Sequence, residues 1–115
     1  MTTLYGLKNC DGCRNAMRWL AQQDIDVAFV DVRKQPLTAD QINTWLEQVD
    51  WSTLVNKRST TWRSLDDTAK AGLSLETTPA LLLEHPSLMK RPLLEHDGDV
   101  FVGFKPADYA AIFSG

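Results

Sequence analysis

The pattern of apolar and polar positions over residues 1–32 predicts a strand, a helix and a second strand. Residues 2–7 (TTLYGL) are rich in residue types that favour strands. From near Asp11, apolar side chains recur at helical spacing, at Cys13, Ala16, Met17 and Leu20. Residues 27–32 (VAFVDV) form an almost continuous apolar run, typical of a strand that is buried on both faces. The pattern therefore indicates a β-α-β unit with two parallel strands.

The middle of the chain is predicted to be helical. Thr38 and Gln41 have the spacing of a capping box at the start of a helix, whose apolar stripe is formed by Ile42, Trp45, Leu46 and Val49. Residues 51–75 contain short helical segments without a long amphipathic run, so we expect a small helical insertion there. Thr78 is predicted to cap another short helix through residues 80–84 (ALLLE), with proline at its first position.

The C-terminal residues predict a hairpin and a final helix. Two apolar runs, Leu93–Glu95 and Val100–Phe104, flank the Asp-Gly pair at residues 97–98, which is a strong signal for a hairpin turn. Pro106 is suited to the first position of a helix. One face of that helix would carry Tyr109, Ala110 and Phe113.

The order β-α-β, helices, β-β-α is that of the thioredoxin superfamily. It predicts one α/β domain over residues 1–115, with a mixed sheet of about four strands and a helical insertion. Thioredoxin-like folds place a cis-proline opposite the cysteine, at the start of the third strand. Pro79 and Pro92 are both candidates, but only Pro92 is followed by a hairpin and a helix. We therefore expect the Arg91-Pro92 bond to be cis.

Composition and charge narrow the classes of function. The chain carries 12 Lys+Arg against 15 Asp+Glu, for a net charge of −3, and so shows no overall basic surface for nucleic acid. The N-terminus lacks the basic and apolar regions of a signal peptide, and no apolar stretch approaches the roughly 20 residues of a membrane helix. We expect a cytoplasmic protein with no direct nucleic-acid partner and no membrane association.

The two cysteines, Cys10 and Cys13, form a C-x-x-C motif at the junction between the first strand and its helix. In a reducing compartment such a motif is more often redox-active or metal-binding than a structural disulfide. A zinc site would need His85 and His96, which lack the close spacing of a zinc finger, so no metal is expected. The helix N-terminus favours a thiolate at Cys10. Cys13 is either a resolving thiol or a small buried residue of the apolar stripe.

Three basic residues are candidates for binding an anionic substrate. Arg91 precedes the expected cis-proline, which fixes its direction, and its guanidinium can bind a carboxylate or an oxyanion through two hydrogen bonds. Lys105 leads into the final helix, near the cysteine edge of such a fold, and Arg58 lies in the predicted insertion. The alternative for each residue is a solvated surface charge.

Four segments resemble the arsenate-reductase-like branch of the thioredoxin superfamily, which includes the ArsC, Spx and YffB groups. They are LYGLKNCDGCRNAMRWL, LVNKRSTTWRSL, HPSLMKRPLL and VGFKPADY, which occur in the expected order, and the resemblance is nearest to the YffB group. It implies a principal nucleophile at Cys10 and matches Arg91 to the arginine that precedes the cis-proline. Lys105 stands where arsenate reductases carry arginine, and Arg58 is an approximate counterpart of their insertion arginine.

The resemblance implies a glutathione-dependent thiol-disulfide reductase. Cys10 would attack the disulfide, Arg91, Pro92, Lys105 and Arg58 would bind substrate, and glutathione would be a co-substrate rather than a bound cofactor. Two alternatives remain. A Spx-like redox regulator would use the C-x-x-C motif as a switch and bind RNA polymerase. An arsenate reductase would need a strong oxyanion site, and lysine is not equivalent to arginine as an oxyanion clamp.

Overall fold

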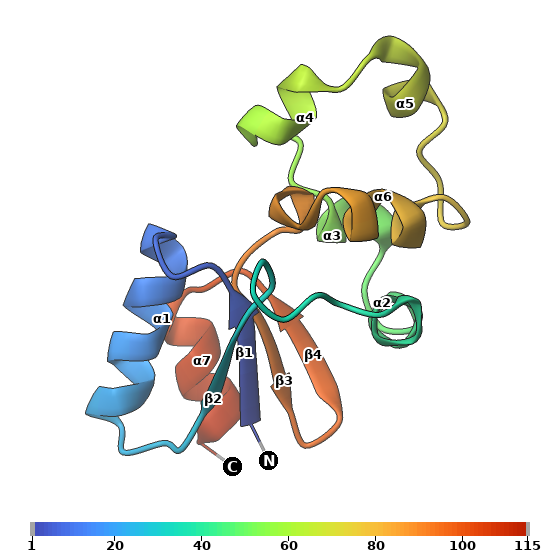
Figure 1. The fold of residues 1–115 in the computed structure, drawn as a ribbon. Coiled ribbons are helices and arrows are strands. Elements are labelled where there is room, and N and C mark those ends of the chain that lie inside the picture. The colour runs from blue at the N-terminus through green and yellow to red at the C-terminus, as the bar shows by residue number, and fades with distance from the viewer. Residues whose placement is uncertain (1, 115) are drawn as a thin grey trace. The chain divides into compact units, whose positions relative to one another are not determined.

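The computed structural model describes residues 2–114, which belong to two units of the chain. The first unit combines the two ends of the sequence, Met1–Asp31 and Arg91–Gly115, and the second is Val32–Lys90. Figure 1 shows the sheet and its two helices in the first unit, and a series of short helices in the second. That both units form one domain stays a prediction.

The sheet of the first unit confirms the predicted topology. Its strands are β1 (Thr2–Gly6), β2 (Ala28–Asp31), β3 (Leu93–His96) and β4 (Asp99–Val102), and they lie in the order β2-β1-β3-β4. β1 runs parallel to β2 and antiparallel to β3, which is antiparallel to β4. The molecule therefore has the mixed sheet of a thioredoxin-like α/β fold.

The burial of β2 differs from the sequence prediction. This strand lies at the edge of the sheet, where it pairs only with β1, and each of its four residues is exposed or half-buried. The expectation of a strand buried on both faces was therefore wrong. A sheet face is buried only where other elements cover it, and an edge strand is covered less fully than a central one, so an apolar run alone does not show that both faces are buried.

The hairpin turn between β3 and β4 forms at the predicted Asp-Gly pair. Asp97 and Gly98 have φ values of 51° and 88°, as the two-residue turn of a tight hairpin requires. β4 ends at Val102, two residues earlier than predicted, because Gly103 leaves the strand with a φ of 84°. The Gly103 N–H donates to the carbonyl oxygen of Pro92 at 2.8 Å.

Two helices, α1 (Asp11–Gln22) and α7 (Pro106–Phe113), pack on one face of the sheet (Figure 1). The core between the helices and the sheet contains Leu4, Ala16, Leu20, Leu94 and Tyr109. The predicted inner face of α7 was wrong at Ala110, which is exposed, whereas Ile112 packs against the core beside Phe113.

The second unit confirms the predicted helical insertion. Its elements are α2 (Ala39–Leu46), α3 (Trp51–Leu54), α4 (Thr60–Ser64), α5 (Asp67–Ala71), α6 (Thr78–Glu84) and a 3₁₀ turn, η1 (Pro86–Leu88). The capping box of α2 at Thr38 and Gln41 is present. For α6, the prediction of Thr78 as N-cap was wrong by one residue. Thr77 is the N-cap, and the Thr78 hydroxyl instead donates to the carbonyl oxygen of Ser74 at 2.6 Å.

Within residues 2–114, no helix is both long enough and apolar enough to cross a membrane.

Candidate functional site

Cys10 is the N-cap of α1, as the sequence pattern predicts. Its backbone is extended, with φ −88° and ψ 123°, and its side chain is half-exposed. The Cys10 N–H donates to the carbonyl oxygen of Leu7 at 3.2 Å, and its own carbonyl oxygen accepts from Arg14 N–H at 3.0 Å. These two hydrogen bonds hold the residue at the point where the strand segment becomes a helix. This partly exposed cysteine therefore stands at the end of the helix where the first N–H groups have no partner within the helix.

The Arg91-Pro92 bond is cis, which confirms the choice of Pro92 over Pro79. Gly12, in the first turn of α1, shows how near this bond lies to the thiol. A Cβ atom placed on Gly12 would be 3.6 Å from Pro92 Cδ, 3.8 Å from the Arg91 carbonyl oxygen and 3.9 Å from Cys10 Sγ. The cysteine and the cis-proline therefore meet around one small residue.

The surroundings of Cys10 lower its thiol pKa. Burial opposes ionisation, but the Cys13 N–H, the Cys13 thiol and the Arg91 side chain together outweigh it. The Cys10 side chain makes no capping hydrogen bond of ordinary geometry, so the Cys13 N–H acts mainly through its electrostatic field. Arg91 contributes both a hydrogen bond to the sulfur and a positive charge. The site therefore favours a nucleophilic thiolate.

Cys13 is a different kind of thiol, because its side chain is only 1% exposed. Burial raises the pKa of Cys13 to about 12. A hydrogen bond from the Leu7 backbone opposes this increase, the hydrogen bond and charge of Cys10 add to it, and the charge of Arg91 opposes it weakly. Its sulfur packs against Gly6, where an added Cβ would collide with it. At neutral pH Cys13 is a protonated thiol that donates to Cys10.

The structure brings three of the predicted site residues, Cys13, Arg91 and Pro92, to Cys10. Lys105 belongs to the same unit, where it is the exposed N-cap of α7, but the side chains that lower the pKa of Cys10 are those of Cys13 and Arg91. Arg58 is an exposed residue of the second unit, and its N–H donates to Asn56 Oδ1 at 3.1 Å. The substrate-binding roles of Lys105 and Arg58 stay predictions.

No group of three or more His, Cys, Asp or Glu residues within residues 2–114 is arranged to hold a metal ion. His96, considered as a zinc ligand with Cys10, is instead within 2.8 Å of the Thr2 hydroxyl through Nδ1 and packs against the Phe113 ring.

Two glycines of this site were missed by the sequence analysis. Gly12 lies between Cys10 and Pro92, and Gly6, the last residue of β1, leaves room for the sulfur of Cys13. Neither carries a reactive side chain, so a search for chemistry could not select them. The available signal was their position, one between the two cysteines and one at the end of the preceding strand.

Two substitutions test whether the Cys13 thiol lowers the pKa of Cys10. Cys13→Ala removes the S–H donor and is expected to raise the pKa of Cys10, whereas Cys13→Ser supplies an O–H donor and should keep that pKa low. The rate of alkylation by iodoacetamide, measured against pH, reports the pKa in each variant, and Cys10→Ser gives the background rate. The same pKa in the alanine variant as in the wild type would show that the Cys13 thiol does not support the thiolate.

Comparisons with known proteins show what the whole chain is similar to. Residues 5–112 match the model of the ArsC family. A Haemophilus influenzae protein described as uncharacterized is 41% identical over 114 residues, which cover 99% of this chain and 100% of that protein. The global transcriptional regulator Spx of Bacillus subtilis is 28% identical over 106 residues, 90% of this chain and 80% of Spx. A solved structure of a protein named YFFB is similar with a TM-score of 0.93 and 37% identity, over 96% of this chain and 97% of that one.

Proposed function

The chain belongs to the ArsC family, and from this premise we propose that it is a glutathione-dependent thiol-disulfide reductase with Cys10 as its nucleophile. The observation that carries the proposal is the position of Cys10 at the N-cap of α1, close to the cis Arg91-Pro92 bond, where Arg91 helps to lower its thiol pKa. A thiolate is the reactive form in thiol-disulfide exchange, and a thiol that ionises near ambient pH attacks most effectively. A reducing cytoplasm would supply glutathione and keep Cys10 and Cys13 reduced.

The reaction takes place in two exchange steps. The Cys10 thiolate attacks the glutathione sulfur of a mixed disulfide, a Cys10–glutathione bond forms, and the substrate leaves as a thiolate that takes a proton from water. The thiolate of a second glutathione then attacks the Cys10–glutathione bond. Oxidised glutathione leaves and the Cys10 thiolate is regenerated. In sum, the mixed disulfide and one glutathione thiol become the substrate thiol and oxidised glutathione, so that thiol is the reductant and no bound cofactor is needed.

The substrate would be held by the cis-proline and the neighbouring cations. Pro92 lies beside the first turn of α1, where the ring would form one wall of the tripeptide site next to Cys10. Arg91 would bind a glutathione carboxylate through its planar guanidinium, as well as supporting the thiolate. Lys105 and Arg58 are proposed as further partners for the carboxylates of glutathione.

The proposal predicts a covalent glutathione adduct at Cys10. After treatment with oxidised glutathione, mass spectrometry of proteolytic peptides should locate one adduct on Cys10, because its thiolate is the form that attacks a disulfide. Cys10→Ser should abolish the adduct, whereas Cys13→Ser, the matched control, should retain it. An unmodified wild-type protein, or an adduct on Cys13 alone, would rule out Cys10 as the nucleophile.

A redox-sensing regulator is the second candidate, favoured by the similarity to Spx and by the pair of free cysteines. In this function an oxidant would join Cys10 to Cys13 and alter binding to RNA polymerase. Mild peroxide should then produce an intramolecular disulfide, and polymerase should bind the reduced and oxidised forms unequally. Arsenate reduction is a weaker candidate because Lys105 lacks the planar fork of arginine, and we expect little arsenate turnover with glutathione and glutaredoxin.

A further inference from the structure

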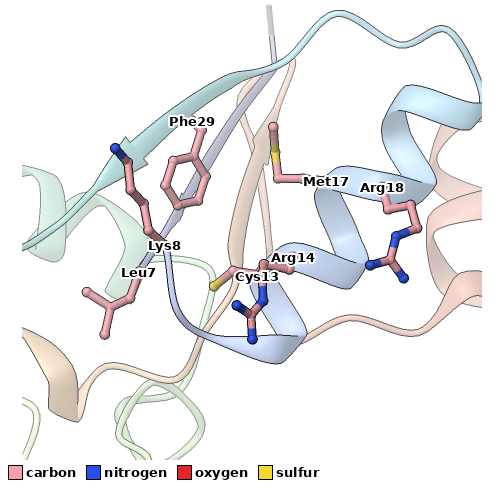
Figure 2. Close-up of a pocket in the computed structure, with 7 residues that line it drawn as sticks. All are labelled: Leu7, Lys8, Cys13, Arg14, Met17, Arg18 and Phe29. Atoms are coloured by element: carbon pink, nitrogen blue, oxygen red, sulfur yellow. The ribbon is translucent and has the colours of Figure 1, made fainter.

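A cavity of about 430 Å³ opens beside α1, within the first unit. Its apolar lining is formed by Leu7, Met17 and Phe29, together with the side chain of Cys13. In Figure 2 the three apolar residues belong to three parts of the unit: Leu7 to the segment before α1, Met17 to α1 and Phe29 to β2. The volume lies within the range of sites for small molecules, roughly 300 to 1,000 Å³.

The polar residues that line this cavity are all basic. They are Lys8, Arg14 and Arg18, the last two one helical turn apart on α1 (Figure 2). Arg14 is paired with the carboxylate of Asp11. Arg18 is exposed, and no ion pair links it to another of residues 2–114. Although the chain has a net charge of −3, this cavity combines an apolar lining with an excess of positive charge.

We propose that this cavity binds a small amphipathic carboxylate. Its apolar tail would lie against Leu7, Met17 and Phe29, where burial removes hydrocarbon from water. Its carboxylate would accept hydrogen bonds from the guanidinium of Arg18, a group suited to paired bonds with a carboxylate. Because Arg14 is already engaged by Asp11, one guanidinium fork is available, which matches a single carboxylate better than a doubly charged phosphate.

The cavity adjoins the proposed thiol site through Cys13 but does not include the reactive Cys10. Cys13, and not Cys10, contributes to its lining, and the Cys13 thiol stays protonated at neutral pH. A ligand here would therefore be held without a covalent bond. The proposed binding of a carboxylate does not depend on the reductase function. The Cys10→Ser variant should therefore bind the carboxylate as the wild type does.

Octanoate is a suitable probe, with 1-octanol as its uncharged counterpart. NMR spectra of the full chain labelled at the methionine methyl groups would be recorded during both titrations. We expect octanoate to shift the Met17 methyl signal in a saturable manner, while that of Met89, a fully buried residue that does not line the cavity, stays constant and serves as the internal reference. Octanoate should bind more tightly than octanol.

Arg18→Gln tests the charge without disturbing the core, because Arg18 is exposed. It should weaken octanoate binding about two- to fivefold, as an exposed ion pair worth up to about 1 kcal/mol implies, and leave octanol binding unchanged. Arg18→Lys should bind octanoate with intermediate affinity, and Arg63→Gln, a basic-to-neutral change on α4, should bind it as the wild type does. Equal affinity for octanol and octanoate, an unaffected Arg18→Gln variant, or an unsaturable or absent shift at Met17 would each overturn the proposal.

Discussion

Replacing Arg91 with glutamine is expected to raise the pKa of Cys10 and to slow the reaction of its thiol near neutral pH. Burial of Cys10 favours the neutral thiol, and Arg91 is one of the groups that reverse this preference, through a hydrogen bond and through its charge. Below the pKa, each unit of increase lowers the thiolate fraction tenfold, while the more basic thiolate becomes a better nucleophile. The two effects together leave a loss of roughly three- to fourfold in rate per unit.

Stopped-flow alkylation of the Cys13→Ser background between pH 5 and about 9 would isolate the Cys10 thiol for this measurement. Arg91→Lys keeps the charge but loses the planar fork, so its pKa should lie between those of the wild type and Arg91→Gln. Lys90→Gln, at the exposed neighbouring residue, is the matched control and should leave the rate unchanged. An unaltered pH profile in Arg91→Gln would show that the thiolate does not depend on Arg91 and is supported by the backbone and side chain at position 13.

The second large effect is expected on stability, from Gly6→Ala. The added methyl group would collide with the sulfur of Cys13, so this buried side chain would have to shift from its packed position. Overpacking of a buried site typically costs about 1–3 kcal/mol of folding free energy. Urea denaturation followed by circular dichroism should show a lower midpoint for Gly6→Ala with an unchanged slope.

A double-mutant cycle would show whether the collision with sulfur is the cause. In a Cys13→Ala background the Gly6→Ala penalty should shrink, though not vanish, because the Cys13 Cβ would still lie 3.3 Å from the new methyl group. Gly12→Ala is the matched control. Its methyl group meets only ordinary contacts of 3.6 Å or more, and alanine favours the helix. The same penalty in both backgrounds would place the cost in the backbone of β1 rather than in the sulfur.

The features that sequence analysis located best are those encoded over a few adjacent residues. The Thr38 and Gln41 side chains cap α2 by themselves, and the Asp97-Gly98 pair adopts the positive φ values of a tight turn. Cys10 could be placed at the start of α1 because the helical spacing begins directly after it. The cis-proline could not be chosen from adjacent residues alone, because Pro92 was preferred to Pro79 on the hairpin and the helix that follow it.

The features that were missed depend on contacts between distant segments. The edge position of β2 follows from the order of strands and not from its own apolar residues. Ala110 and Ile112 lie on the same short helix, and which of them faces the core depends on where the sheet lies. Gly6 is needed only because the folded chain packs the sulfur of Cys13 against it, where a larger residue would collide. These three features concern the environment of a residue, whereas the misplaced N-cap of α6 and the early end of β4 concern local conformation.

The pairing of β1 with β3 brings Cys10 together with Arg91, which lies far along the chain. An unfolded chain has no such pairing, so its cysteine ionises like an ordinary thiol, and the acidity of Cys10 is a product of folding. By thermodynamic linkage, ionisation in turn stabilises the native state: this contribution is present above the pKa of the unfolded chain and disappears as the pH falls through the lower native value. A molecule in which the two strands separate would thus lose its reactive sulfur along with its tertiary structure.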